Sequence, residues 1–294
     1  MYKVSNEQYL VAIPCYNEEL YIGSVILQVK EYIDHILVID DGSTDKTAVI
    51  AERAGAVVMR HASNRGKGAA VSSAFEYASN GKFDALVLID GDGQHDPAFI
   101  PAVLKPVLDG EADMVVGSRY LGVKCSVPFY RMLGQHIITF FTNLGSSVKI
   151  TDSQSGYRCF SRKAIEAMSF AERGLSVEAE MQFLANEAGL KVKEVPVNIL
   201  YHDKMKRNPV VHGVGVLNSV IGFISRRIPL FFFGIPGIVM LGFGIWNGWR
   251  VVDGYNEFGD FWLGPALIAV LLCIVGCLSI FTGLILHSIK SLLK

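Results

Sequence analysis

Apolar and polar residues alternate along the first two thirds of the chain in a pattern that predicts short strands separated by helices. The apolar runs that predict buried strands are 9–14, 35–39, 56–59, 85–89 and 114–116. The segments with apolar residues at helical spacing are 18–32, 44–54 and 67–79. Regular alternation of strands and helices favours a mostly parallel sheet with helices on both faces. We therefore predict a Rossmann-like α/β fold for this part of the chain.

The last third contains two long stretches without Asp, Glu, Lys or Arg, at 228–249 and 261–288. Each exceeds the roughly 20 apolar residues that a helix needs to cross a bilayer core. We predict a hairpin of two transmembrane helices, at 229–249 and 261–288. The alternative is a pair of buried helices in a soluble core, where charge-free runs of this length are rare.

Basic residues flank the predicted hairpin, with Arg226 and Arg227 before the first span and Lys290 and Lys294 after the second. The charged residues of the connecting segment, 250–260, are mainly acidic. Because positively charged flanks tend to stay in the cytoplasm, we predict that both termini and the large N-terminal domain are cytoplasmic. The chain would then be an integral membrane protein anchored by its C-terminal hairpin.

Two further segments, 130–150 and 210–228, are apolar but too interrupted by polar residues to span a membrane. Such segments suit helices that lie in the membrane interface, although ordinary core packing gives the same pattern. The predicted organisation is a cytoplasmic domain at 1–209, in which 130–150 is an interfacial helix, then a juxtamembrane amphipathic helix at 210–228, and then the hairpin.

Charge and cysteine content argue against several classes of protein. The formal net charge of −1 argues against a nucleic-acid binder, which would carry a clearly basic domain. None of the five cysteines forms a C-x-x-C pair, so we expect neither a disulfide framework nor a zinc site. The first apolar run is too short to be the core of a signal peptide.

Acidic side chains cluster after two of the predicted strands. Asp40 and Asp41 follow the second strand, and Asp90 and Asp92 follow the strand at 85–89. Ligands bind beyond the carboxyl ends of parallel strands, so these carboxylates lie where a site is expected. Clustered carboxylates repel one another unless a cation lies between them. This favours Mg²⁺ or Mn²⁺ as a cofactor, completed by substrate phosphates.

Each motif has a simpler explanation when it is taken alone. D-G-S-T at 41–44 is a common turn with a helix cap, and D-G-D-G at 90–93 is also compatible with a turn. An EF-hand is excluded because no Glu stands at the twelfth loop position, and the glycine-rich loop at 64–68 does not match a P-loop. The order of these motifs, each after a strand, is what favours a nucleotide site.

With these motifs the chain resembles family 2 glycosyltransferases of the GT-A fold, and more narrowly the dolichyl-phosphate (polyprenyl-phosphate) sugar synthases. The matching segments are I-P-C-Y-N-E at 13–18, V-I-D-D-G-S-T-D at 38–45, N-R-G-K-G-A at 64–69, the D-x-D at 90–92, G-S-R-Y at 117–120, D-S-Q-S-G-Y-R at 152–158, E-A-E at 178–180 and E-V-P-V at 194–197. The resemblance implies a catalytic GT-A domain followed by a membrane anchor.

The resemblance also implies roles for individual residues. The implied nucleotide-sugar contacts are Pro14, Tyr16, Glu18, Asp40, Asp41, Lys67, Asp90, Gly91, Asp92 and Arg207. The implied metal ligands are Asp90, Asp92 and Gln94, and the implied contacts of the acceptor's phosphate are Ser118, Arg119 and Arg131. Many members carry R-x-x-G-x-S-K after the E-V-P-V strand. Here residues 201–208 read Y-H-D-K-M-K-R-N, and of these we expect Arg207 to reach the diphosphate.

The acceptor decides which catalytic groups are needed. A phosphate monoester has a second pKa near ~6 and arrives as a competent nucleophile, whereas a hydroxyl acceptor needs a general base. Arg119 and Arg131 would position such a phosphate because arginine forks match its geometry, the alternative being plain surface arginines. Asp152 and Glu180 are the candidates if a base is needed. The predicted catalytic set is Asp92, Arg119, Arg131, Asp152 and Glu180.

We expect inverting transfer of a hexose or N-acetylhexosamine from a nucleotide-sugar to polyprenyl or dolichyl phosphate at the membrane. A UDP-sugar is favoured over a GDP-sugar because D-G-D-G-Q-H resembles UDP-using members. Two alternatives stay open, a saccharide acceptor as in polysaccharide synthases and a catalytically silent nucleotide-sugar-binding subunit. Against the first, Gln154 is followed by S-G-Y-R-C and not by the synthase motif Q-x-x-R-W. A homo-oligomer also stays open, because small residues such as Gly242 and Gly244 are available in the anchor.

Overall fold

The structure is a computed structural model that describes residues 8–121, 129–144, 146–170, 177–199, 222, 225 and 228–292. At 129–131, 133 and 141 it describes the backbone but not the side chains. The chain divides into two compact units, Met1–Val220 and Ile221–Lys294. Arg207 and most of the predicted juxtamembrane helix at 210–228 lie outside the described residues.

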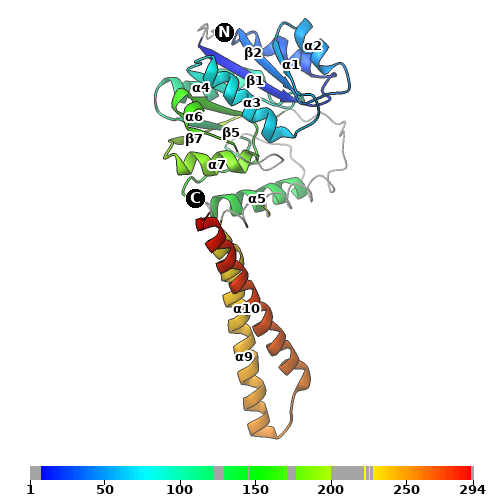
Figure 1. Cartoon of the computed structure of the whole chain (residues 1–294), viewed down its shortest axis with the longest axis vertical. Helices are drawn as coiled ribbons and strands as arrows, with labels where there is room; N and C mark the ends of the chain where they lie inside the picture. Colours follow the sequence, from blue (N-terminus) through cyan, green and yellow to red (C-terminus); the bar gives the residue numbers. More distant parts are fainter. Residues whose placement is uncertain are drawn as a thin grey trace. The chain divides into compact units, whose positions relative to one another are not determined.

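The first unit contains a seven-stranded sheet with the order β3-β2-β1-β4-β6-β5-β7 (Figure 1). The strands are β1 (Tyr9–Cys15), β2 (His35–Asp40), β3 (Val57–Arg60), β4 (Ala85–Leu88), β5 (Met114–Ser118), β6 (Arg158–Ser161) and β7 (Val192–Pro196). β3, β2, β1 and β4 pair in parallel, as do β5 and β7, and β6 runs antiparallel between β4 and β5. The mostly parallel sheet is therefore confirmed, and β6 is a strand that the apolar pattern did not predict.

Helices cover both faces of this sheet, as the alternating pattern predicts (Figure 1). They are α1 (Ile22–Val29), α2 (Thr47–Arg53), α3 (Lys67–Asn80), α4 (Ile100–Leu108), α6 (Arg162–Ala167) and α7 (Val177–Glu187), with a 3-10 turn η1 (Pro97–Phe99) before α4. Successive strand residues point to opposite faces. In β1, Val11 packs with α1 and α4, whereas Ala12 packs with α3 and α7. Each face therefore has its own apolar core.

The topology brings several loops to one edge of the sheet. β1, β2, β4 and β5 run in the same direction, so the loops that follow them meet at their carboxyl ends. β6 runs in the opposite direction, so the segment that precedes it, 152–157, reaches the same edge. Many of the predicted site residues, among them Asp41, Asp90, Asp92, Arg119 and Asp152, are in these loops.

α5 (Phe129–Leu144) lies in the segment 130–150 that was predicted to be an interfacial helix. One side of α5 is attached to the domain, since Thr139 Oγ1 lies 3.0 Å from Ser153 Oγ. Its exposed large apolar side chains are Ile137, Phe140 and Leu144. These residues are three and four positions apart and form one stripe along the helix. α5 thus has the two-sided character that an interfacial helix requires, and its contact with a membrane stays a prediction.

The second unit is a helical hairpin. It consists of η2 (Leu230–Gly234), which is a turn of π-helix, α9 (Ile235–Phe258) and α10 (Leu263–Leu292). The two helical segments are long and apolar enough to cross a membrane, with mean hydropathies of 1.7 and 2.7. Most of their large apolar side chains are exposed, which disfavours the alternative of two buried core helices. α9 continues past the predicted end of the first span at residue 249, so its last turns carry Arg250, Asp253 and Glu257.

Small residues let the two helices of the hairpin pack closely. The residues buried at intervals of seven are Gly237, Gly244 and Val251 on α9 and Ala269, Gly276 and Gly283 on α10. A Cβ atom on Gly276 would lie 2.8 Å from Gly237 O, and one on Gly237 would lie 2.8 Å from Gly276 O. Gly244 is likewise closed off by Cys273, whereas a Cβ on Gly242 would meet nothing within 4 Å. The hairpin itself therefore uses part of the glycine surface that the sequence offered for oligomer contacts.

We expect Gly276→Ala to destabilise the hairpin, because the added Cβ collides with backbone atoms that cannot rotate away. Overpacking of this kind typically costs about 1–3 kcal/mol. The thermal unfolding midpoint of the detergent-solubilised protein, followed by tryptophan fluorescence, should fall. Gly242→Ala is the matched control because its Cβ points into open space. An equal fall in both variants would show that the helices do not pack as described.

Candidate active site

Lys67, the first residue of α3, links the D-x-D loop to α7. Its Nζ atom lies 2.7 Å from Asp90 Oδ1 and 2.8 Å from Glu178 Oε1. Burial alone would lower the pKa of Lys67, but Asp90 and Glu178 raise it above its ordinary value, so the ammonium group stays charged. Burial would raise the pKa of Asp90, and Lys67 followed by His95 lowers it instead. Lys67 therefore keeps Asp90 ionised and oriented.

Asp92 is held by the residue that follows the D-x-D motif by two positions. The backbone N–H of Gln94 donates to Asp92 Oδ1 at 3.0 Å, and its side-chain amide donates to Asp92 Oδ2 at 2.8 Å. Burial, and after it the neighbouring Asp90 carboxylate, raise the pKa of Asp92. A charge that is buried beside a like charge is stabilised by a nearby cation.

The carboxylates fit a divalent cation whose remaining ligands come from a substrate. Within the described residues, no group of three or more His, Cys, Asp and Glu side chains is arranged to hold a metal. Asp90 and Asp92 provide two hard oxygen donors, and Gln94 provides an amide oxygen next to them. Mg²⁺ and Mn²⁺ are commonly bound by one or two carboxylates together with substrate phosphates. The donor set therefore fits a metal that binds with a diphosphate.

His95 is a buried residue of this loop that sequence reasoning missed. The backbone N–H of Asp90 donates to His95 Nδ1 at 3.3 Å, so in the neutral ring the proton is on Nε2. Burial lowers the pKa of His95, although Asp90 and Asp92 oppose the shift. The imidazole is therefore neutral near pH 7 and fixes the turn between the two aspartates and α4. The sequence used His95 only as part of D-G-D-G-Q-H, and nothing in that motif predicted that the histidine would be buried.

The segment before β6 packs against the back of Asp90. A Cβ atom on Gly156 would lie 2.4 Å from Asp90 Oδ2, so only glycine fits here. Arg158 holds this segment, since its guanidinium donates to Ser155 O and Ser153 O at 2.9 Å each. Burial lowers the pKa of Arg158 to about 10, so it remains charged at neutral pH. Arg158 and Gly156 together define the wall behind the first aspartate.

Gly91 is explained by packing. A Cβ atom on Gly91 would lie 3.0 Å from the Cβ of Cys15 and 3.3 Å from Ile13 Cγ2. The glycine between the two aspartates therefore lets the loop lie close against the end of β1. This close contact explains why position 91 is a glycine, and no contact with a ligand is needed to explain it.

The carboxylate of Asp40, a predicted nucleotide-sugar contact, is held by contacts within the domain. Asp40 is fully buried, and its Oδ1 accepts from Ser43 N at 2.9 Å while Arg60 Nε lies 3.0 Å from Oδ2. Asp40 is therefore held inside the domain, and its contact with the nucleotide-sugar stays a prediction. It stabilises the turn that begins at Asp41.

Asp41 anchors the glycine-rich loop. It accepts from Arg65 N at 2.9 Å and Gly66 N at 2.8 Å, and His61 Nδ1 lies 2.7 Å from its Oδ1. These contacts place Lys67 directly after the loop. Asp41 is 4% exposed, so its described role is to position the loop, and a contact with the base stays a prediction.

The end of β1 forms the adjoining wall of the predicted nucleotide pocket. Pro14 is buried, and Tyr16 and Glu18 are half-buried at the start of the following loop. The loop is tied to the one after β2, because Glu18 N donates to Thr47 Oγ1 at 2.8 Å. The structure thus brings these residues to the same edge as Asp41, as predicted, and does not test their contact with a nucleotide.

Arg119 follows β5 and forms a two-point ion pair with Asp152. Its Nε donates to Asp152 Oδ2 and its Nη2 to Asp152 Oδ1, each at 2.6 Å. Asp152 has no exposed surface, and Arg119 is 8% exposed. Arg119 also contributes to the low pKa of Asp90, so it lies close enough to the D-x-D loop to act on its charge. Both oxygens of Asp152 therefore bind Arg119, and its role as a candidate base stays a prediction.

The remaining predicted acceptor and catalytic residues of the first unit are Ser118, Glu180 and Arg131. Ser118 is buried and its Oγ lies 2.6 Å from Thr151 Oγ1, so it stabilises the loop, and its contact with a phosphate stays a prediction. Glu180 is fully buried in α7. The other glutamate of the E-A-E segment, Glu178, forms the ion pair with Lys67. Arg131 is part of α5, and its side chain lies outside the described residues. Arg207 also lies outside the described residues.

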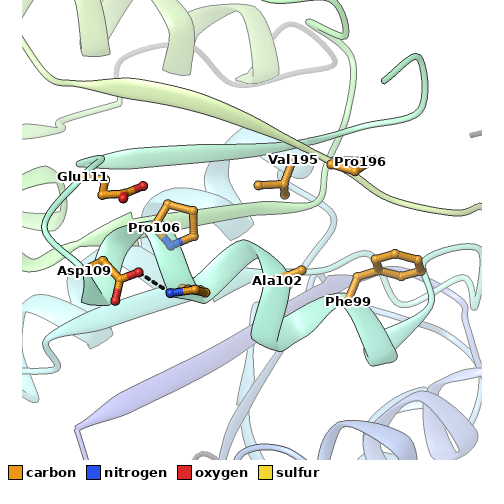
Figure 2. A pocket seen from close by; sticks show the side chains of 8 residues that line it. Phe99, Ala102, Pro106, Asp109, Glu111, Val195 and Pro196 are labelled. Atoms are coloured by element: carbon orange, nitrogen blue, oxygen red, sulfur yellow. Dashed lines mark hydrogen bonds and ion pairs between the residues drawn. The ribbon is translucent and has the colours of Figure 1, made fainter. Parts of the chain in front are cut away.

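A cavity of about 430 Å³ lies elsewhere on the first unit, between α4 and β7 (Figure 2). It is lined by Phe99, Ala102, Lys105, Pro106, Asp109, Glu111, Val195 and Pro196. None of the predicted site residues lines it. Figure 2 shows mainly apolar groups in its centre and Asp109 and Glu111 at one end, which does not suit a diphosphate.

Comparison with known proteins agrees with the geometry of the carboxyl edge. Glycosyl transferase family 2 matches residues 10–169. An uncharacterized protein of Methanocaldococcus jannaschii is 35% identical over 226 residues, which cover 74% of this chain and 93% of that protein. The UDP-N-acetylglucosamine–dolichyl-phosphate N-acetylglucosaminyltransferase of Methanococcus voltae is 31% identical over 215 residues, 66% of this chain and 85% of that one. The polyprenol monophosphomannose synthase of Mycolicibacterium smegmatis is 30% identical over 201 residues, 64% and 76% of the two chains.

A solved structure shows the same fold. Glucosyl-3-phosphoglycerate synthase of Mycobacterium tuberculosis, in complex with Mn²⁺, uridine diphosphate and phosphoglyceric acid, has a TM-score of 0.61 at 24% identity. The match covers 75% of this chain and 78% of that chain. The expected GT-A fold is therefore confirmed. Since the family match spans more than half of the 294 residues, this chain belongs to glycosyl transferase family 2.

Proposed function

We propose that this protein is a membrane-anchored glycosyltransferase that transfers a hexose or N-acetylhexosamine from a UDP-sugar to polyprenyl or dolichyl phosphate. The observation that carries the proposal is that the same edge of the sheet holds the carboxylates of Asp90 and Asp92 and also Arg119, an arginine fixed by Asp152. Carboxylates suit a metal bound to the donor's diphosphate, and a fixed guanidinium suits the acceptor's phosphate. Two relatives are named for transfer to dolichyl phosphate and for synthesis of polyprenol monophosphomannose, which supports the same acceptor class.

At the donor end, Asp90 and Asp92 would hold Mg²⁺ or Mn²⁺, which would neutralise the charge that develops on the departing nucleoside diphosphate. Gln94 orients Asp92 through two hydrogen bonds. Lys67 keeps Asp90 ionised, so the carboxylate is ready to bind without first losing a proton. The Mn²⁺ and uridine diphosphate bound by the structural relative support a divalent metal and a uridine donor.

At the acceptor end, Arg119 would bind the phosphate monoester and direct one of its oxygens at the anomeric carbon. The oxygen already carries negative charge at neutral pH, so no side chain has to remove a proton. This agrees with the engagement of both Asp152 oxygens by Arg119. As the new C–O bond forms, the bond to the nucleotide's phosphate oxygen breaks. A single displacement inverts the anomeric centre, so an α-linked donor gives a β-linked product.

A lipid acceptor also agrees with the apolar surfaces. Ile137, Phe140 and Leu144 give α5 an exposed apolar stripe, and the C-terminal hairpin is long enough to span a bilayer. We propose that α5 lies in the membrane interface and that the prenyl chain stays in the bilayer while its phosphate meets Arg119. The basic flanks of the hairpin support a cytoplasmic position for the catalytic unit.

The test is product formation by the purified, detergent-solubilised protein. The protein would receive radiolabelled UDP- and GDP-sugars, Mg²⁺ or Mn²⁺, and polyprenyl or dolichyl phosphate, and organic extraction would separate labelled lipid. We expect label in lipid from one UDP-sugar, and none after EDTA. Label from a GDP-sugar alone would correct the nucleotide. No labelled lipid from any donor, despite tight nucleotide binding, would exclude the lipid acceptor and favour a saccharide acceptor or a silent binding subunit.

A further inference from the structure

Glu194, in the edge strand β7, binds the turn that carries Asp152. Its Oε1 accepts from Thr151 N at 2.8 Å, from Thr151 Oγ1 at 2.9 Å and from Asp152 N at 3.3 Å. Its Oε2 also accepts from Thr151 N, at 2.9 Å. One carboxylate therefore accepts hydrogen bonds from the backbone N–H groups of both Thr151 and Asp152.

The same turn controls the orientation of Arg119. The two oxygens of Asp152 accept hydrogen bonds from Nε and Nη2 along one edge of the Arg119 guanidinium. Asp152 also accepts from Arg119 N at 3.2 Å. Thr151 Oγ1 contacts Ser118, the residue before Arg119, at 2.6 Å. A guanidinium is planar, so a two-point contact along one edge fixes the direction in which the rest of the group points. A shift of the turn must therefore rotate Arg119.

The pairing of β5 and β7 explains why Glu194 can hold this turn. The two strands run in parallel with Val116 opposite Glu194 and Ser118 opposite Pro196. The register places the glutamate beside the end of the strand from which Arg119 emerges. A one-residue shift of register would turn Glu194 to the other face of the sheet.

We propose that Glu194 is a positioning residue for the acceptor phosphate, acting through Thr151 and Asp152 on the orientation of Arg119. The proposal rests on the proposed function, in which Arg119 binds that phosphate. Glu194 itself does not touch the reacting atoms, and no proton moves along the chain of contacts. Its effect should fall mainly on the acceptor side, because Lys67, Asp90 and Asp92 are held by other partners.

The experiment compares Glu194→Ala with Glu194→Gln in steady-state kinetics, with donor and acceptor varied separately. In Glu194→Ala the turn loses its acceptor, and the acceptor KM should rise about 10- to 100-fold, the range expected for a small displacement of a binding group. The donor KM and the affinity for UDP with Mn²⁺, measured by calorimetry, should stay within about 3-fold, a change below 1 kcal/mol. Glutamine retains one oxygen in the position that accepts most of the hydrogen bonds, so Glu194→Gln should keep nearly the wild-type acceptor KM.

Two further variants, Thr151→Val and Arg119→Ala, separate failure of the positioning role from failure of the proposed function. Thr151→Val removes the hydroxyl contact alone and should raise the acceptor KM by a smaller factor, which keeps the test open if Glu194→Ala does not fold. A large acceptor effect in Arg119→Ala with none in Glu194→Ala and Thr151→Val would overturn the positioning role and leave the proposed function intact. No acceptor effect in Arg119→Ala would overturn the proposed function itself. Equal increases in donor and acceptor KM in Glu194→Ala would also overturn the proposal, because they indicate general damage.

Discussion

Replacement of Asp92 by asparagine is expected to lower sugar transfer by about 100-fold or more, the scale seen when a preorganised electrostatic group is removed from an active site. The substitution keeps the shape of the side chain and removes one of the two charges that would hold the metal. The Gln94 amide donates to Asp92 Oδ2, so the carboxylate's second oxygen already has a fixed partner and cannot simply be replaced by an amide nitrogen. Turnover as a function of Mn²⁺ concentration measures the effect, and Mn²⁺ binding in the presence of UDP, followed by electron paramagnetic resonance, gives an independent readout.

The matched control is Asp96→Asn, which removes the same charge four residues later. Asp96 Oδ1 accepts from Ala98 N at 2.9 Å and caps the turn η1. Asparagine caps as well as aspartate does, so this variant should keep wild-type activity. Normal Mn²⁺ binding and turnover in Asp92→Asn would mean that the metal is held elsewhere.

The affinity for the metal should depend on pH through Asp92. Burial and the neighbouring Asp90 raise the pKa of Asp92, so protons compete with the metal from a higher pH than at an ordinary aspartate. The Mn²⁺ concentration that gives half-maximal activity in the wild type should therefore increase as the pH is lowered.

The elements of the first unit that the sequence predicted well are those with an uninterrupted apolar run. β1, β2 and β4 are buried on both faces, so their residues are almost all apolar and stand out from the helices between them. β6 has four residues and starts with Arg158, whose guanidinium donates to two carbonyl groups of its own preceding loop. Nothing in the local pattern distinguishes this strand from a loop, since its place in the sheet depends on partners distant in sequence.

The candidate site shows a similar division. Asp90 and Asp92 were predicted because they follow a strand whose carboxyl end lies at the edge where ligands bind, and Lys67 and Arg119 because the family resemblance implied their roles. Their partners were not, because the contact of Lys67 with Glu178 joins the start of α3 to the start of α7. Spacing along the chain carries no information about such a contact. The same reason explains why the ion pair of Asp152 with Arg119 was not predicted from the sequence.

Replacement of Gly156 by alanine is expected to reduce sugar transfer by about 100-fold, the scale associated with a displacement of about 1 Å in an active site. A methyl group there would lie 2.4 Å from Asp90 Oδ2 and 2.9 Å from Asp90 Cγ, well inside van der Waals contact. The carboxylate cannot simply move away, because Lys67 holds its other oxygen at 2.7 Å. The loop cannot easily retreat either, because Arg158 binds two of its carbonyl groups from inside the domain.

The variant separates the position of Asp90 from its charge, since Gly156→Ala leaves every ionisable group in place. Mn²⁺ affinity should weaken together with turnover, and the thermal unfolding midpoint should also fall, because the added methyl group overpacks the segment before β6 against Asp90. Gly242→Ala, whose added methyl group meets nothing within 4 Å, should keep wild-type activity and serves as the control for the same chemical change. If Gly156→Ala retained both activity and Mn²⁺ affinity, the orientation of Asp90 set by Lys67 and by the segment before β6 would have no role in catalysis. The D-x-D carboxylates would then have to be positioned by the metal and the diphosphate on binding.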